Sequence, residues 1–186
     1  MPKIGITGNP GVGKHTITNL LSEKIKCSKI IDINKIIISN KAFNFETFDA
    51  DLKKTRELLK GLINNNENLI IVGHLLPYVI KKNELDFIVI LRRSPYSLLE
   101  TYKKRKYSTK KIHENIVSEI LGICFYDTLR TFGPKKISEI DTTYNDPEDS
   151  VKKIIYTYDY KSERQIGIID WLDLVYKNGD AKRFLM

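Results

Sequence analysis

The residues best suited to chemistry lie near the start of the chain, where glycines surround one lysine in the segment GNPGVGKHT, residues 8–16. Glycines let the backbone wrap inward, so that successive N–H groups and the positive end of a following helix point at one anion. Lys14 can then reach the outer phosphates of the same ligand. Ile4 and Ile6 before the segment and a helical pattern over 17–25 fit a strand–loop–helix context. The segment predicts a phosphate-binding P-loop; a glycine-rich turn without a ligand is the alternative.

One position departs from the usual P-loop, which has Ser or Thr directly after the lysine as a Mg²⁺ ligand. This chain has His15 there and Thr16 next. The spacing resembles that of the adenylate kinases and related nucleoside monophosphate kinases, which implies that Mg²⁺ is held mainly through water, with Thr16 or Asp32 as candidate groups beside it. The pattern favours a small-molecule kinase over a switch GTPase. The residues expected to bind ATP in this loop are Gly11, Val12, Gly13, Lys14, His15 and Thr16.

Two further candidates for the site are His74 and Arg105. His74 follows the apolar run 69–72 and so lies at the carboxyl end of a predicted central strand, although a structural histidine is the alternative. At the end of that strand, where P-loop enzymes commonly place an acid for the Mg²⁺ shell, this chain has Val72 or Gly73. Arg105 ends a helical segment, and its guanidinium could spread the charge of a transferring phosphoryl group while binding ATP.

The region from about 30 to 53 is where a monophosphate-binding insertion would lie. Asp32 and Asn34 end the predicted strand 29–33, where they could face the ligand or cap the next helix. The cations that could meet an acceptor phosphate, or simply face solvent, are Lys53, Lys54 and Arg56.

These candidates are positioned by apolar runs that alternate with helical patterns, which indicates an α/β fold. The predicted strands are residues 3–7, 29–33, 68–72, 87–91 and 136–141. With the P-loop, they predict a P-loop NTPase fold in which a five-stranded parallel sheet is flanked by helices and carries small monophosphate-binding and lid insertions.

Two later segments carry specific expectations. Ser108 or Thr109 is expected to cap one long helix with a buried stripe of isoleucines, namely Ile112, Ile116, Ile120 and Ile123. Asp146 is expected to begin the following helix. The loop 142–145 would lie over the nucleotide base if the last strand neighbours the P-loop strand.

The chain has 186 residues, of which 41% are hydrophobic, and this fits a single kinase domain over 1–186. Within it we expect a lid at about 104–114 and a C-terminal appendage at 158–186. Neither an export signal nor a membrane span is apparent, so a cytoplasmic protein is expected. The cysteines, Cys27 and Cys124, lack the spacing of a zinc site or disulfide framework and are expected to be buried. The net charge of +8 could favour contact with nucleotide phosphates or RNA, and a solvent-facing lysine surface is the alternative.

The lid segment 105–116, followed by Glu119, resembles one family: the adenylate kinase isoenzyme 6 type, or coilin-interacting nuclear ATPases, with archaeal relatives named as adenylate kinases. Its pattern is approximately R-G-Y-x-x-x-K-I-x-E-N-I-x-x-E-I, and Lys106 stands where glycine is usual. In this resemblance Arg105 matches the lid arginine and His74 the histidine of a D-x-H motif. Val72 replaces the acid of that motif, which predicts weakened ATPase activity more than weakened nucleotide binding.

The resemblance implies an adenylate kinase that uses ATP, Mg²⁺ and the acceptor AMP (ATP + AMP = 2 ADP), with slow ATPase activity. It also implies a role in small ribosomal subunit (16S/18S rRNA) maturation, beside a ribosomal protein and rRNA. The expected catalytic residues are Lys14, Arg105 and His74, in a monomer when free. Two alternatives remain: a ribosome-assembly ATPase with incidental kinase activity, and a P-loop kinase of another small acceptor such as shikimate or dephospho-coenzyme A.

Overall fold

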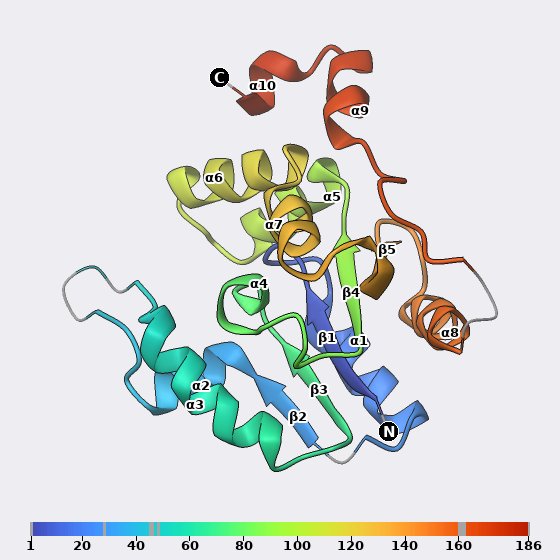
Figure 1. Ribbon diagram of the computed structural model, residues 1–186. Helices are drawn as coiled ribbons and strands as arrows, with labels where there is room; N and C mark the ends of the chain where they lie inside the picture. The colour runs from blue at the N-terminus through green and yellow to red at the C-terminus, as the bar shows by residue number, and fades with distance from the viewer. Residues whose placement is uncertain (1, 28, 45–46, 48, 160–162, 186) are drawn as a thin grey trace.

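The computed structural model describes residues 2–27, 29–44, 47, 49–159 and 163–185 (Figure 1). Residues 45–46 and 48 of the predicted monophosphate-binding region, and residues 160–162 and 186 of the predicted appendage, lie outside the described residues. The rest forms a five-stranded parallel sheet in the order β2-β3-β1-β4-β5, with helices packed against it. The predicted fold class is confirmed.

Each predicted strand is present, with its boundary shifted by at most one residue. The strands are β1 (Lys3–Thr7), β2 (Lys29–Asp32), β3 (Leu69–Val72), β4 (Phe87–Arg92) and β5 (Ile137–Asp141). All neighbours pair in parallel, so the carboxyl ends of the strands lie along one edge. The predicted position of the loop 142–145 depended on the last strand being next to the P-loop strand. That adjacency is wrong, because β4 lies between the P-loop strand β1 and the last strand β5.

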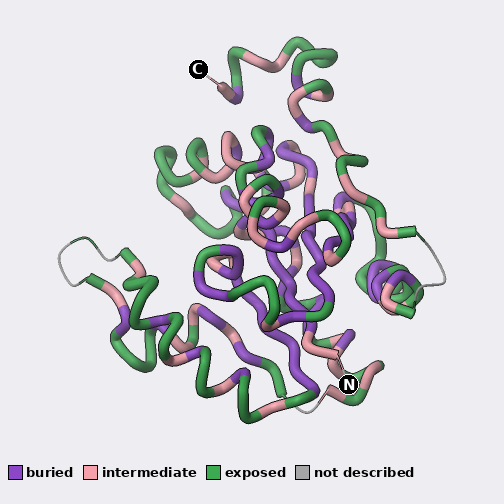
Figure 2. The backbone as a smooth tube through the Cα atoms, in the orientation of Figure 1, coloured by how far each residue is buried: buried purple, intermediate pink, exposed green. Residues whose placement is uncertain are grey.

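Two apolar cores form because alternate side chains of each strand point to opposite faces. In β4, Phe87, Val89 and Leu91 join the core under α1 (Lys14–Lys24) and α8 (Pro147–Tyr158). Ile88 and Ile90 join the other core. That second core is covered by α2 (Ile33–Ser39), α3 (Leu52–Asn64), α4 (Leu76–Val79) and α7 (Ile123–Phe132). Figure 2 shows β1, β3, β4 and β5 largely buried between these layers, whereas the edge strand β2 is exposed at its start.

The single long helix expected after Ser108 is wrong. The structure has α6 (Thr109–Ile120) and then α7, separated by Gly122 with a left-handed φ of 65°. This conformation suits glycine, because it has no Cβ, and it turns the chain. Ile116 and Ile120 are buried as expected, whereas Ile123 begins the second helix and is 45% exposed. Ser108, not Thr109, is the cap residue, since its hydroxyl accepts a hydrogen bond from the Lys111 N–H.

The segment after β4 and the end of the chain pack together. α5 (Pro95–Lys104) contacts α6, and α6 contacts both α9 (Trp171–Lys177) and α10 (Ala181–Leu185). The buried side chains of Trp171 and Phe184 belong to the same core as β1. A short 3₁₀ turn, Pro134–Lys136, leads into β5. Figure 1 shows α9 and α10 beyond α5 and α6, at the carboxyl edge of the sheet.

Three smaller findings complete the fold. Asp146 begins α8 as predicted, since its carboxylate accepts a hydrogen bond from the Glu148 N–H. Both cysteines are free thiols; Cys124 is buried, but Cys27 is only half-buried, so the expectation of a buried Cys27 is wrong. Within the described part of the chain, each helix is too short or too polar to cross a bilayer.

Candidate functional site

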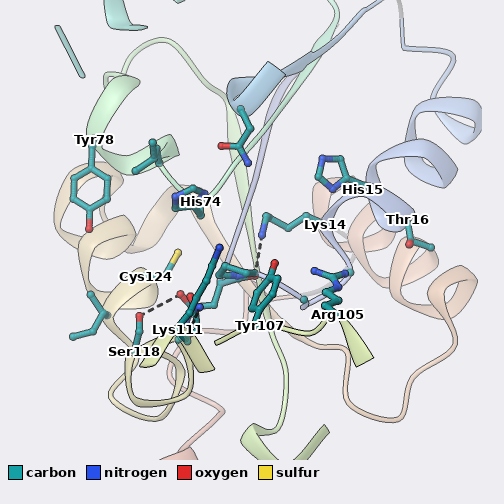
Figure 3. Close-up of a pocket in the computed structure, with 18 residues that line it drawn as sticks. Lys14, His15, Thr16, His74, Tyr78, Arg105, Tyr107, Lys111, Ser118 and Cys124 are labelled. Carbon is teal, nitrogen blue, oxygen red and sulfur yellow. Dashed lines mark hydrogen bonds between the residues drawn. The ribbon is translucent and has the colours of Figure 1, made fainter. Parts of the chain in front are cut away.

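A cavity of about 640 Å³ opens at the carboxyl edge of the sheet, in front of the P-loop (Figure 3). Its walls come from the P-loop, the start of α2, the segment after β3, the segment between α5 and α6, α6 itself, and the start of α7. Among the predicted site residues, the cavity is lined by Gly11, Gly13, Lys14, His15, Thr16, His74 and Arg105. The structure therefore brings together segments that are nearly a hundred residues apart in the sequence.

Lys14 occupies the floor of this cavity and is only 7% exposed. Its ammonium group donates hydrogen bonds to the carbonyl oxygens of Gly8 (2.9 Å) and Asn9 (2.8 Å). The loop can close this tightly because Gly8 has a φ of 136°, and a Cβ there would lie 2.3 Å from the Leu91 carbonyl oxygen. Burial lowers the pKa of Lys14 to about 8, since the charged form loses hydration. An anionic ligand would restore that charge.

His74 and Arg105 approach Lys14 from two sides, as Figure 3 shows. His74 follows β3 and is half-buried. Its pKa is lowered from the usual 6.5, first by burial and then by the positive charge of Lys14, so at neutral pH the imidazole is uncharged. Arg105 caps the carboxyl end of α5 and faces the same cavity. These three side chains thus bring two cations and one neutral imidazole to the cavity.

The sequence did not predict the contacts by which Tyr102, Tyr107 and Lys111 stack on one another and on the P-loop. The hydroxyl of Tyr102 donates a hydrogen bond to the Pro10 carbonyl oxygen (2.6 Å). The ring of Tyr107 stacks on Tyr102 with centroids 5.5 Å apart, and the Lys111 ammonium lies 4.5 Å from the Tyr107 centroid. Both Tyr107 and Lys111 line the cavity. The signal available in the sequence was aromatic residues interleaved with the lysines of this segment.

His15, which lines the cavity, forms a pair with Asp32, since His15 Nε2 donates a hydrogen bond to Asp32 Oδ2 (2.8 Å). The other carboxylate oxygen of Asp32 accepts from the N–H groups of Asn34 and Lys35 and so caps α2. The side chain of Asp32 is largely buried, whereas His15 is exposed. The capping role considered for Asp32 is therefore present, and the same carboxylate also faces the first turn of α1.

The described residues do not form a site that could coordinate a metal ion directly. Among them, no cluster of three or more His, Cys, Asp or Glu side chains could hold an ion. Val72, at the position of the usual acid, is 1% exposed and belongs to the core under α1. The groups that fit a metal held through water are Thr16, which lines the cavity, and the Asp32 carboxylate, which is hydrogen-bonded to His15, the residue before Thr16.

Two further cavities each share two or three lining residues with the first. One, of about 400 Å³, shares Gly13 and Thr16 with it and is closed by the loop 142–145, whose Tyr144 is 93% exposed. This loop reaches the P-loop although β5 is not adjacent to β1, because the Thr142 hydroxyl donates a hydrogen bond to the Val12 carbonyl oxygen (2.9 Å). The other, of about 590 Å³, shares polar and apolar walls with the first, namely Asn34, His74 and Leu75.

The cations considered for an acceptor phosphate line none of these three cavities. Lys54 donates to the Lys41 carbonyl oxygen (3.2 Å), and Arg56 donates to the Tyr78 carbonyl oxygen (2.7 Å). Lys53 is exposed on α3. The third cavity is instead walled by apolar side chains of the region after β2, namely Ile37, Ile38, Phe43 and Ala50, with Asp49 among them.

The parallel sheet, the P-loop at its carboxyl edge and the converging cations define a P-loop kinase of the nucleoside monophosphate kinase type. The sequence matches the family described as "AAA domain" over residues 4–122. It is also 32% identical to the "Putative adenylate kinase" of Methanococcus maripaludis, over 91% of this chain and 95% of that one. The protein of the same name from Methanocaldococcus jannaschii is 32% identical over 92% and 93% of the two chains. The chain belongs to this archaeal adenylate kinase family.

Solved structures agree on the fold. The shikimate kinase of Acinetobacter baumannii, in complex with shikimate, matches with a TM-score of 0.64 at 17% identity, over 87% of this chain and 95% of that one. The deoxyadenosine kinase of M. mycoides with bound dATP matches with a TM-score of 0.55 at 18% identity, over 84% and 99%. At these identities the likeness concerns the fold alone.

Proposed function

We propose that this protein transfers the γ-phosphoryl group of ATP to AMP, giving two ADP, with slow hydrolysis of ATP as a side activity. One observation carries the proposal: the cavity that holds Lys14 shares lining residues with a cavity at the loop 142–145 and with another beside α2. A donor nucleotide and an acceptor nucleotide can then meet head to head over the P-loop. This arrangement suits in-line transfer between two phosphate groups.

In this reading the donor base lies against the loop 142–145 and its phosphates lie in the P-loop cavity. Lys14 and the loop N–H groups hold the β- and γ-phosphates, and Arg105 faces them from the lid. An oxygen of the AMP phosphate forms the new bond to the γ-phosphorus as the bond to the β–γ bridging oxygen breaks. Cations already in place stabilise the charge on the transferring group, so catalysis needs positioning and electrostatics and no covalent intermediate.

Mg²⁺, when bound, would neutralise charge on the β- and γ-phosphates. Thr16 and Asp32 are the residues of this chain that we propose to hold its water ligands. His15, in the position of the usual hydroxyl, orients the Asp32 carboxylate through its hydrogen bond. This assignment gives His15 a role. It stands where a hydroxyl would bind the metal directly, and it instead orients the carboxylate that binds the metal through water.

The acceptor is proposed to occupy the cavity between α2 and the segment after β3. Its apolar walls, including Ile37 and Phe43, can cover a purine face. Asn34 and the neutral His74 lie where this cavity joins the P-loop cavity, so they are placed to donate hydrogen bonds to the AMP phosphate. We also propose that residues 30–53 act as the monophosphate-binding region, 104–114 as the lid and 158–186 as an appendage of one domain.

Isothermal titration of AMP, in the presence of a non-hydrolysable ATP analogue, tests the acceptor. Saturable binding of AMP supports the proposal. Binding of the ATP analogue without binding of AMP would contradict it and favour a P-loop kinase of another acceptor, which a parallel titration with shikimate and with dephospho-coenzyme A would identify.

The Lys14→Ala variant tests the donor site. Lys14 should contact the phosphates most strongly in the transition state, so we expect its kcat/KM for ATP-to-AMP transfer to fall by about 10²–10³-fold. A matched control is Lys24→Ala, at the far end of the same helix α1, which should transfer at the wild-type rate. Near-normal transfer by Lys14→Ala would rule out this assignment.

A role in maturing the small ribosomal subunit, beside a ribosomal protein and rRNA, is proposed from the resemblance of the lid segment and from the net charge of +8. In the alternative, the chain is a ribosome-assembly ATPase and its kinase activity is incidental. Phosphate release in the absence of AMP, measured with and without small-subunit precursor particles, separates the two. Stimulation of ATP hydrolysis by the particles, without AMP binding in the titration above, would favour the alternative.

A further inference from the structure

A fully buried carboxylate, Glu119 in α6, joins three parts of the molecule that are far apart in the sequence. One of its oxygens, Oε2, accepts a hydrogen bond from the side-chain amide of Asn9 in the P-loop (2.7 Å). The other, Oε1, accepts from the guanidinium of Arg92 at the end of β4 (2.7 Å) and from the indole N–H of Trp171 in α9 (3.0 Å). Such a carboxylate is stable only while its partners stay in place.

The Asn9 end of this network reaches the centre of the site. The Asn9 carbonyl oxygen accepts from the Lys14 ammonium (2.8 Å), and the Asn9 side chain also accepts from the Ser118 hydroxyl (3.2 Å). Asn9 is therefore held through its side chain by α6 and in turn holds the lysine through its main chain. Asn9 and Ser118 both line the P-loop cavity, whereas Glu119 does not.

The Trp171 end reaches the C-terminal tail. α9 begins at Trp171, and the following α10 packs on α6. Arg92 is itself shared, since its Nη1 donates to Glu139 (2.8 Å), and Glu139 accepts from the Ile168 N–H (3.0 Å) just before α9. The tail thus supplies one hydrogen bond to each of two buried carboxylates. If the tail moved away, each carboxylate would keep Arg92 but lose that donor, and such a loss is costly in a core.

We infer that Glu119 is a positioning residue which sets the P-loop through Asn9, and that docking of the tail helix α9 through Trp171 tunes the affinity of the loop for the donor nucleotide. The path has three hydrogen bonds: Trp171 to Glu119, Glu119 to Asn9, and Asn9 to Lys14. A partner that captured the tail would then weaken nucleotide binding without touching the cavity. The inference rests only on the donor-nucleotide part of the proposed function.

The chain offers a direct reporter, because Trp171 is its one tryptophan. Titration of the wild-type protein with a non-hydrolysable ATP analogue is expected to change the emission of Trp171. In Asn9→Ala, calorimetry should show binding about three- to tenfold weaker, the range of one neutral hydrogen bond, with most of the emission change lost. An unaltered emission change in Asn9→Ala would overturn the path.

The tail end is tested by Trp171→Phe, which keeps an aromatic ring and removes the N–H donor. We expect the ATP analogue to bind about three- to tenfold more weakly, with circular dichroism showing an intact fold. The matched control is Tyr176→Phe, on the exposed side of the same helix, which should bind as the wild type does. Equal affinities of the two variants would overturn the role of the tail.

The double variant Asn9→Ala/Trp171→Phe separates coupling from two independent structural effects. If both residues act through Glu119, the double variant should bind the analogue no more weakly than Asn9→Ala alone, because the path is already broken. Losses that multiply would overturn the inference. AMP takes no part in these measurements, so a failure of the ATP-to-AMP assignment would appear as absent AMP binding with this response intact.

Discussion

Asp32 lies directly opposite Val72 in the parallel pairing of β2 with β3. The carboxylate that P-loop enzymes commonly carry at the end of the strand occupied here by β3 is thus missing, while a carboxylate ends the neighbouring strand. His15 fixes that carboxylate with a 2.8 Å hydrogen bond. Val72 and His15 both depart from the usual P-loop kinase pattern, and both are neighbours of the same carboxylate, Asp32.

The Asp32→Asn variant tests whether this acid serves the metal. Asparagine caps a helix about as well as aspartate, so α2 should remain folded while the negative charge is lost. We expect kcat/KM with Mg²⁺ to fall by about tenfold and the Mg²⁺ concentration for half-maximal rate to rise. Asp51→Asn, at the cap of α3 outside the cavities, is the control. Identical Mg²⁺ dependence of both variants would exclude Asp32 from the metal shell.

Two neighbouring lysines in the lid, Lys110 and Lys111, allow a test variant to be compared with a matched control. Lys111 lies over Tyr107 and lines the P-loop cavity, whereas Lys110 is exposed and lies 4.0 Å from Glu114. We expect Lys111→Ala to lower kcat/KM by about tenfold, since a cation near the transferring group is lost. Lys110→Ala should stay near the wild type, because exposed ion pairs contribute little. Equal steady-state rates of the two variants would show that the stacked lysine has no contact with substrate.

The lowered pKa of Lys14, about 8, predicts a pH dependence of nucleotide binding. Phosphates favour the charged ammonium, so above pH 8 the empty protein must take up a proton on binding ATP. Affinity should therefore fall by up to about tenfold per pH unit above 8. Calorimetry in buffers of different ionisation enthalpy measures that proton. Lys14→Met should show weak binding without proton uptake, and an uptake that persists in Lys14→Met would assign it to another group.

The lowered pKa of Lys14 has the opposite effect on the stability of the empty protein, which should increase with pH. Between pH 8 and 10.5 the unfolded chain binds more protons at Lys14 than the folded protein does. The free energy of unfolding should then rise with pH across this window, relative to Lys14→Met. Urea denaturation of the two proteins at pH 7.5, 9 and 10 measures the difference. A constant difference across these pH values would mean that Lys14 titrates normally.

His74 is predicted to stay neutral through the physiological range. Its pKa is lowered from 6.5 by burial and by Lys14, so protonation should begin only in more acidic solution. Nuclear magnetic resonance titration of its ring carbons should give a midpoint below 6.5. The transfer rate should show no inflection from His74 between pH 6.5 and 8. A midpoint at or above 6.5 would mean that the imidazole is solvated or faces an acid.

Much of this architecture is local and could therefore be predicted. The P-loop is readable because its glycines and Lys14 must be contiguous to surround an anion. The strands are readable because continuous apolar runs such as 69–72 suit a sheet that is covered on both faces. Asp146 could be assigned as a cap from its position before Pro147. Each of these signals spans fewer than about ten residues and carries its own physical reason.

The helix after Ser108 shows where local pattern fails. The apolar spacing continues through Ile123, and only the left-handed backbone of Gly122 divides the segment. Periodicity counts side chains and does not register a change of chain direction, so the pattern predicted one helix. The expected adjacency of the last strand to the P-loop strand failed in a similar way, since strand order depends on how the connections cross the sheet.

Some features of the site could be predicted from the sequence, and others depended on the tertiary structure. By itself the sequence determined the fold class, the P-loop and the candidates Lys14, His74 and Arg105, because each follows from residue type and a short spacing. Only the tertiary structure decided that Asp32 neighbours Val72, that Lys111 stacks over Tyr107, and that Glu119 joins Asn9 to Trp171. These contacts depend on strand register, on a stacked lid and on long-range packing, and no local pattern encodes which distant groups a folded chain brings into contact.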